Sequence, residues 1–194
     1  MLLHDKLKEF RLILASQSPR RRQLLSDAGI EYELAPRFEC DEVFPEDLPA
    51  VEVAEYLSRL KSEAYPLPLE KNDILLTADT VVVAGGEVLG KPTDRADAIA
   101  IIEKLSGKEH EVITGVTLRS ADAVKSFSSH SKVHFRTLSR EEIEYYVDTY
   151  SPMDKAGAYG IQDGGLVEKI EGSYTNVVGF PVELVKNMLE KEWV

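Results

Sequence analysis

Three consecutive arginines, Arg20 to Arg22, directly follow a serine and a proline and are well suited to bind an anion. Ser18 is a good helix N-cap, and Pro19 suits the first helical position because it has no N–H group to leave unpaired. The arginines then lie in the first helical turn, where the helix dipole disfavours each exposed cation by about 0.3–1 kcal/mol. Free backbone N–H groups together with guanidinium groups favour a polyphosphate as the compensating anion.

The position of this helix start supports the anion site. A short apolar strand predicted over residues 12–15 precedes it, and α/β proteins bind ligands at the carboxyl ends of such strands. The glycine spacing of a Walker loop or of a dinucleotide-binding turn is absent. A second interpretation stays open, in which the arginines are solvated or pair with Asp27 and Glu31. Ser16 likewise either donates to a phosphate or forms a local cap.

Asp79 is the residue with the strongest indication of chemistry, because it lies between two apolar runs, 74–78 and 81–84. This pattern predicts that its carboxylate lies at the end of a buried strand. A buried carboxylate is costly unless it is paired, hydrogen-bonded or bound to a metal. The alternative is that Asp79 accepts hydrogen bonds from Thr77 or Thr80 and shapes a turn.

Two lysines could add positive charge to the same site. Lys91 lies between Gly90 and Pro92, which restrict the backbone around it and indicate a fixed loop. Lys61 lies beside the apolar stripe of a predicted helix, although a lone lysine on a helix usually faces solvent.

Composition limits the partners and the compartment. The 194 residues carry 34 acidic and 23 basic side chains, a net charge of −11, which opposes binding to nucleic acid or to an anionic membrane. The length and the 43 % hydrophobic content predict one domain over residues 1–194, with two lobes. A single cysteine, Cys40, excludes an intramolecular disulfide, and the charged first residues do not resemble a signal peptide. We therefore expect a cytoplasmic protein.

Alternating helix and strand patterns predict an α/β fold. Helices are expected from Pro19 to Gly29 and over 94–105. Another begins at Pro49 and carries an apolar stripe that reaches Ala64. Two more begin at the capping box of Ser139 to Glu142 and near Pro181. Strands are expected at 12–15, 30–34, 74–78, 81–84, 87–89, 111–118 and 124–137, with a hairpin at Gly85–Gly86 and a site-shaping loop over 151–165.

The four histidines do not indicate a zinc site. His130 and His134 are four residues apart on a strand-like segment, where they share a face but do not chelate as they would on a helix. Zinc is therefore not expected. His110 has either a structural hydrogen-bonding role or a catalytic one.

Several motifs together resemble the Maf family of nucleotide pyrophosphatases, which is related in fold to inosine triphosphatase. The resemblance covers nearly the whole chain and keeps the same order. It is carried by residues 12–25, 76–82, 90–92, 110–116, 154–162, 172–174, 176–179 and Pro181.

The resemblance implies an inosine triphosphatase-like α/β fold, with a central mixed twisted sheet flanked by helices and two lobes around an active-site cleft. It implies hydrolysis of a nucleoside triphosphate at the α-phosphorus, which yields the monophosphate and pyrophosphate with the help of Mg²⁺ or Mn²⁺. Asp79 matches the catalytic proton acceptor and a metal contact. In the acidic loop, Asp41-Glu42 resembles the family's acidic pair, with Glu42 as the second metal contact; a solvated loop is the alternative.

Other residues match the positions that bind substrate. Arg20, Arg21, Lys61 and Lys91 correspond to phosphate-binding positions. Arg20, Thr80 and Gln162 resemble the branch that acts on dTTP and UTP, and a glutamine amide can pair with the edge of a uracil or thymine ring. Asp163 and Ser151 depart from the common pattern.

The resemblance therefore favours a house-cleaning dTTP/UTP pyrophosphatase. The alternatives are the branch specific for 7-methyl-GTP and a nucleotide-binding regulator of septum formation and cell division without turnover. The family is associated with cell-division arrest. Whether the chain forms a homodimer stays open.

Overall fold

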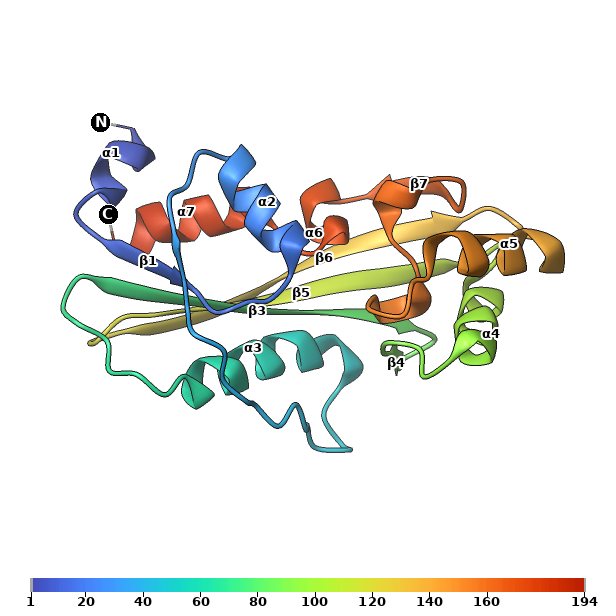
Figure 1. Cartoon of the computed structure of the whole chain (residues 1–194), viewed down its shortest axis with the longest axis horizontal. Helices are drawn as coiled ribbons and strands as arrows, with labels where there is room; N and C mark the ends of the chain where they lie inside the picture. The colour runs from blue at the N-terminus through green and yellow to red at the C-terminus, as the bar shows by residue number, and fades with distance from the viewer. Residues whose placement is uncertain (1, 194) are drawn as a thin grey trace.

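The computed structural model describes residues 2–193 and is built on one mixed β-sheet (Figure 1). Within these residues the sheet has seven strands in the order β2-β1-β3-β5-β6-β7, with β4 paired to β3. The pairs β1–β2 and β1–β3 are parallel, and all other pairs are antiparallel. The strands are β1 (Arg11–Leu14), β2 (Glu33–Leu34), β3 (Asp73–Ala84), β4 (Glu87–Leu89), β5 (Glu109–Arg119), β6 (Val124–Phe135) and β7 (Val167–Glu171). The expected central mixed sheet is confirmed.

Helices cover both faces of this sheet. In Figure 1, α3 lies on one face while α2 and α7 lie on the other, and α4 and α5 pack together beyond the end of β4. The helices are α1 (Leu3–Leu7), α2 (Pro19–Asp27), α3 (Val53–Ala64), α4 (Arg95–Leu105), α5 (Arg140–Tyr150), α6 (Tyr174–Val178) and α7 (Val182–Glu192), with short 3₁₀ turns η1 (Ala50–Glu52), η2 (Ala156–Ala158) and η3 (Ile161–Asp163). No helix among residues 2–193 is both long and apolar enough to cross a membrane.

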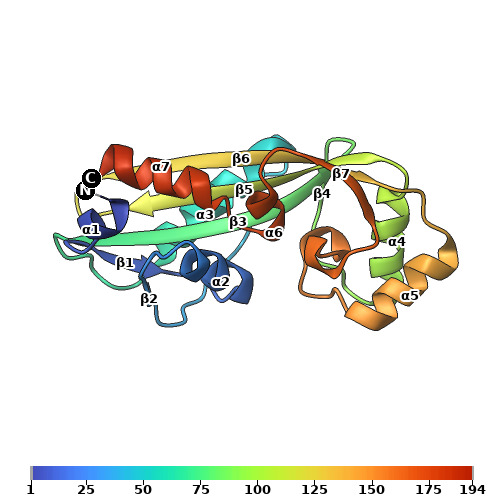
Figure 2. The same ribbon diagram turned by 90° about the horizontal axis from the view of Figure 1, so that it is seen from above.

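Two large hydrophobic clusters form the cores of two lobes, and a smaller one lies between α3 and the sheet. One lobe packs α2 and α7 against β1, β3 and β5, around the fully buried Leu25 and Phe180. The other packs α4 and α5 against β4 and the ends of β5 and β6, around Ile102 and Ile143. Figure 2 shows β3, β5 and β6 running through both lobes, so the sheet itself holds the lobes together.

Most local predictions are confirmed, because they depend on residues close in sequence. Ser18 caps α2 through a bond from the Arg21 amide, and Gly85–Gly86 turns the β3–β4 hairpin with φ values of 58° and 77°. The capping box at Ser139 begins α5, and Asp94 caps α4 rather than forming its first turn.

Three expectations need correction. Of the strand expected at 30–34, only Glu33–Leu34 pairs, because Ile30 is buried in the core and its amide donates to the Leu25 carbonyl at the end of α2. The runs 74–78 and 81–84 form one continuous strand, β3, so Asp79 lies in the middle of a strand and not at its end. The loop expected over 151–165 contains the turns η2 and η3.

Candidate active site

A cleft opens where the edge of β3 is left without a partner. β1 pairs with β3 only over residues 73–76, and β4 pairs with it only over residues 82–84. Residues 77–81 therefore have a neighbouring strand on one side only, β5. Because successive side chains of a strand point to opposite faces, this opening exposes groups from both faces of the sheet to one space.

The cleft has a volume of about 1180 Å³, which is ample for a nucleotide. Six basic and five acidic side chains line it, although acidic residues predominate in the chain as a whole. Positive charge is thus gathered locally, as an anionic ligand requires. The basic residues are Arg20, Arg21, Arg37, Lys61, Lys91 and Lys155, and the acidic ones are Glu39, Glu42, Asp79, Asp154 and Asp163.

Lys61 joins the two carboxylates that the sequence predicted as metal ligands. Its Nζ lies 2.7 Å from Asp79 Oδ1 and 3.0 Å from Glu42 Oε1. Asp79 is buried and faces α3, which carries Lys61, whereas Glu42 comes from the long loop before η1. Within the described residues Oδ2 of Asp79 accepts no hydrogen bond. Both carboxylates therefore point toward the Lys61 ammonium group. Carboxylate oxygens are ligands that suit Mg²⁺ or Mn²⁺.

Arg21 lies on the other side of β3 and is held by neutral groups. Its Nε donates to the Gly179 carbonyl (2.9 Å), its Nη2 to the Thr80 hydroxyl (3.0 Å) and its Nη1 to the Ser16 hydroxyl (3.3 Å). No ion pair to Arg21 is formed anywhere in residues 2–193. Desolvation lowers the pKa of Arg21, and the charge of Asp79 opposes that shift. A positioned guanidinium without a carboxylate partner is a ready anion ligand.

The three arginines do not act as one group. Arg20 lines the cleft and pairs with Asp154 at 3.5 Å, whereas Arg22 donates to the Gln17 carbonyl and is not among the lining residues. Pairing with Asp27 or Glu31, the alternative left open by the sequence, is wrong: among the described residues Asp154 is the acidic partner of this triplet. The helix start turns Arg20 and Arg21 into the cleft and Arg22 away from it.

The remaining predicted residues lie on the cleft wall. Lys91 is exposed and follows β4, and Gln162 is exposed in η3. The Ser16 hydroxyl accepts from the Ser18 amide (3.2 Å) as well as from Arg21, so its local cap is confirmed beside its place in the wall. Thr80 reaches Arg21 and also bonds Thr114 (2.9 Å).

Several cleft residues were missed by the chemical analysis of the sequence. Lys155 lies 3.7 Å from Asp163 and 3.8 Å from Asp154, and the Tyr146 hydroxyl donates to Asp163 (2.7 Å). Burial and the neighbouring carboxylate raise the pKa of Tyr146 above its ordinary value, while a bond from the Gly160 amide opposes the shift. This group holds η3, and with it Gln162, against α5. The signals in the sequence were the motif over 154–162 and the loop predicted over 151–165.

The position of α3 depends on a glycine. A Cβ on Gly115 would lie 2.3 Å from backbone atoms of Ala54 and Glu55, so the helix backbone packs directly on β5. Ser58 and Ser62, both buried, continue this face of α3. The Ser58 hydroxyl bonds Thr117 (2.8 Å), and Arg119 donates to Ser62 (3.0 Å). These contacts fix the helix that delivers Lys61 to Asp79.

Two other sequence candidates lie at or near this site. His110 is buried, bonds the Tyr159 hydroxyl (2.7 Å) and does not line the cleft, which favours the structural alternative. Burial lowers the pKa of His110 to about 4. Cys40 is half-buried in the cleft wall, where desolvation raises the pKa of its thiol.

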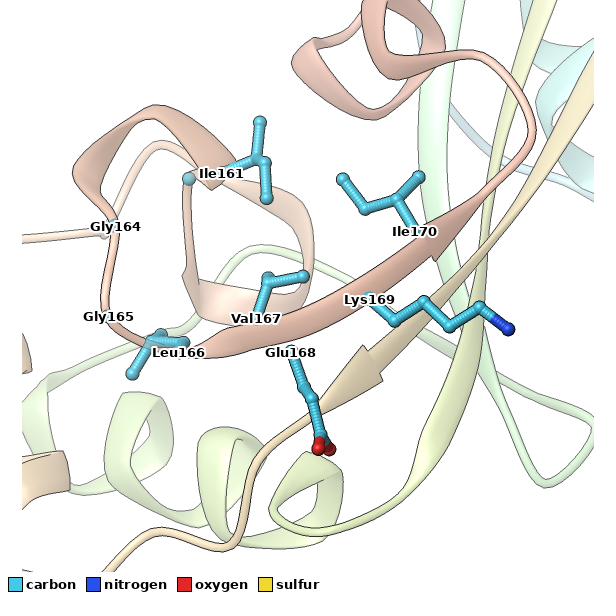
Figure 3. A pocket seen from close by; sticks show the side chains of 9 residues that line it. Ile161, Gly164, Gly165, Leu166, Val167, Glu168, Lys169 and Ile170 are labelled. Atoms are coloured by element: carbon cyan, nitrogen blue, oxygen red, sulfur yellow. The ribbon is translucent and has the colours of Figure 1, made fainter.

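A second hollow, of about 260 Å³, lies beside β7 (Figure 3). Figure 3 shows the side chains of Ile161, Val167 and Ile170 turned toward one another, with Lys169 directed away from them. The hollow lacks converging polar groups among its lining residues, so it does not have the character of a phosphate site.

Comparisons with known proteins agree with the motifs. The family model described as Maf-like protein matches residues 11–192. The "dTTP/UTP pyrophosphatase" of Bacteroides thetaiotaomicron is 46 % identical over 188 residues, covering 95 % of this chain and 97 % of that protein. The protein of the same name from Phocaeicola vulgatus is 45 % identical over 190 residues, covering 96 % and 98 %.

Solved structures give a more distant similarity. A HAM1 protein from Coxiella burnetii aligns over 94 % of this chain and 99 % of its own, with 16 % identity and a TM-score of 0.47. A nucleoside-triphosphatase (dITP/XTP pyrophosphatase) from Mycobacterium abscessus aligns over 95 % and 99 %, with 14 % identity and a TM-score of 0.42. The family match and the near full-length relatives, and not these structures, decide the assignment: this chain belongs to the Maf-like protein family.

Proposed function

We propose that this protein is a nucleoside triphosphate pyrophosphatase that hydrolyses dTTP and UTP to the monophosphate and pyrophosphate. The observation that carries the proposal is the arrangement on the two faces of β3. Asp79 is held by Lys61 on one face, and Arg21, without an acidic partner among the described residues, is held by Thr80 on the other. The names of relatives that are 42–46 % identical supply the substrates.

The chain's own groups divide the chemistry. A triphosphate needs neutralisation of its charge more than covalent help, and Arg20, Arg21, Lys61 and Lys91 provide it. Asp79 accepts a proton from the attacking water while the water oxygen bonds to the α-phosphorus. The bond from that phosphorus to the bridging oxygen breaks, and pyrophosphate leaves with the electron pair.

A divalent cation would add to this. Glu42 and Asp79 are the proposed ligands, and a bound Mg²⁺ or Mn²⁺ would neutralise charge and lower the pKa of water. Lys61 Nζ already lies where positive charge is required between the two carboxylates.

Base selection is assigned to η3. Gln162 is exposed on the cleft wall, and its amide offers both a donor and an acceptor to a pyrimidine edge. Thr80 contributes to substrate binding indirectly, because its hydroxyl orients the Arg21 guanidinium. We also propose that residues 1–194 form one domain, because one sheet runs through both lobes. The cytoplasmic location stays a prediction.

Product analysis tests this function. The purified protein is incubated with dTTP, UTP, dCTP, dATP and 7-methyl-GTP, with and without Mg²⁺ or Mn²⁺, and pyrophosphate is measured. We expect metal-dependent release of pyrophosphate from dTTP and UTP. The variant Asp79→Asn should lose kcat by about 10²–10⁴-fold and should still bind the nucleotide. Asp122→Asn, an exposed aspartate outside the cleft, is the matched control.

Three outcomes would contradict the proposal. Release only from 7-methyl-GTP would assign the chain to the other branch of the family. No turnover with any nucleotide, together with tight binding, would favour a regulator. Full activity of Asp79→Asn would remove the assigned role of that carboxylate.

A further inference from the structure

Three side chains outside the cleft converge on one point of the sheet surface. They are Glu109 of β5, His134 of β6 and Glu171 of β7, and their ligand atoms all lie within 4.8 Å of one another. Glu109 is the direct cross-strand partner of His134, and Glu171 follows two residues after Lys169, the partner of His134 on the other side. Direct and diagonal neighbours of a sheet share one face, so the three side chains belong to one surface.

The separations between these atoms match a metal site. His134 Nε2 lies 3.0 Å from Glu171 Oε2 and 3.3 Å from Glu109 Oε2. Ligands bound tetrahedrally to zinc at 2.0–2.2 Å are separated from one another by about 3.3 Å. A small movement of the two glutamates would bring their inner oxygens together around one ion. Three protein ligands would leave one position for water.

The outer oxygens of both carboxylates are held by lysines. Lys132 lies 3.3 Å from Glu109 Oε1, and Lys169 lies 3.0 Å from Glu171 Oε1. These lysines orient the glutamates and offset their charge, while Oε2 of each remains directed at His134. Such partners of the ligands are typical of metal sites.

We propose that Glu109, His134 and Glu171 form a second divalent metal site, selective for Zn²⁺ or a similar transition ion over Mg²⁺. Imidazole nitrogen suits zinc, cobalt and nickel, whereas Mg²⁺ prefers oxygen ligands throughout. The site is separate from the proposed cleft metal, because none of its three residues lines the cleft. It does not depend on the proposed function.

A bound ion would connect β5, β6 and β7, which are joined here by backbone pairing and by the ion pairs of His134 and Lys132. β7 leads through Gly172 into α6, which is followed by its C-cap Gly179, and the carbonyl of Gly179 accepts from Arg21. The ion would thus anchor the segment between β7 and the cleft. We assign it a stabilising role and no chemical step.

The spacing of histidines in the sequence gave no sign of this site. That spacing argued against a zinc site, because His130 and His134 lie on a strand. The two glutamates that complete the set come from β5 and β7, which are distant in the sequence. His130 offers a natural comparison, because its Nδ1 lies 3.4 Å from a single carboxylate, that of Glu111.

Metal titration tests the proposal. The full-length protein is stripped with a chelator, returned to excess Mg²⁺ to saturate oxygen-only sites, and titrated with ZnCl₂ by calorimetry. The wild type and the matched control His130→Gln should bind one more Zn²⁺ than His134→Gln. Glu171→Gln, a second variant, should also lose this site while keeping the circular dichroism spectrum of the folded protein.

Two further measurements do not depend on activity. Zn²⁺ at about 100 times its Kd should raise the Tm of the wild type by about 5–10 °C and leave His134→Gln at the lower value. Co²⁺ should produce d–d absorption in the wild type and in His130→Gln but not in His134→Gln. Equal Zn²⁺ stoichiometry in the wild type and His134→Gln, or no saturable binding to the wild type, would overturn the proposal.

Discussion

Gly115 of β5 lies directly opposite Asp79 of β3, on the face of the sheet that α3 covers. The missing side chain lets the backbone of α3 approach to a distance that no Cβ would permit, and α3 carries Lys61 to the Asp79 carboxylate. A glycine without a side chain therefore determines how closely α3 brings Lys61 to Asp79.

Substitution Gly115→Ala should consequently affect both folding and activity. The added carbon would meet backbone rather than a flexible side chain, so the helix must move, at a cost of about 1–3 kcal/mol or more in the free energy of unfolding. Chemical denaturation measures this cost, and kcat for dTTP should fall as Lys61 withdraws from Asp79. Gly90→Ala, with no atom within 4 Å of the added carbon, is the control for stability. A change below about 0.5 kcal/mol in Gly115→Ala would contradict the close packing.

Substitution Thr80→Val should weaken catalysis through Arg21. Valine keeps the shape of threonine but removes the hydroxyl that accepts from the guanidinium, and a hydrogen bond to a charged group contributes about 1.5–3 kcal/mol. We expect kcat/KM for dTTP to fall about tenfold or more. Thr80→Ser retains the hydroxyl and should retain most of the activity. Equal losses in both variants would show that the methyl group, and not the hydroxyl, matters.

Substitution Asp154→Asn should strengthen substrate binding. Asp154 competes with the triphosphate for Arg20, although the pair is partly exposed and therefore contributes only about 0.2–1 kcal/mol. The KM for dTTP should fall by a factor of about 1.5–5 at low salt, and the effect should shrink at high salt because screening weakens the competing pair. An increase in KM would instead mean that Asp154 positions Arg20 for the substrate.

Protonation of His110 should destabilise the protein in acid. Its pKa is about 4 in the folded state against 6.5 for a free histidine, because burial disfavours the charged form. Between these values the unfolded chain binds a proton that the folded chain excludes. The resulting stability is complete above pH 6.5 and is lost as the pH falls toward 4, by up to about 3 kcal/mol.

Denaturation at several pH values checks this effect. The variant His110→Gln should lose less stability than the wild type between pH 6.5 and 4, because it has no imidazole to protonate. His130→Gln, which removes an exposed histidine, should keep the wild-type slope. Identical slopes in the wild type and His110→Gln would show that other groups govern the response to acid.

Substitution Ser151→Gly should stabilise the protein. Ser151 ends α5 in the left-handed region, with φ 45° and ψ 62°, a conformation that costs a side-chain-bearing residue about 1–2 kcal/mol. Glycine removes this strain but loses more entropy on folding, so we expect a net gain of about 0.5–1 kcal/mol in urea denaturation. Ser151→Ala keeps the Cβ and should show no such gain. A loss of stability in Ser151→Gly would mean that the serine side chain contributes more than its strain costs.

The sequence by itself determined the local elements and most of the charged groups proposed to bind substrate and metal. The cap at Ser18, the capping box at Ser139 and the Gly85–Gly86 hairpin follow from residues a few positions apart, so their physical causes are visible in the chain. The substrate and metal residues matched by the family resemblance all line the cleft, whereas Arg22 of the predicted arginine triplet does not.

Only the tertiary structure decided how these residues meet. The sequence placed Asp79 at a strand end, whereas its accessibility comes from the gap that β1 and β4 leave along the edge of β3. Strand pairing also gathered Glu109, His134 and Glu171 on one surface. The physical reason is the same in each case: register between distant segments fixes which side chains share a face, and no pattern along a single segment encodes it.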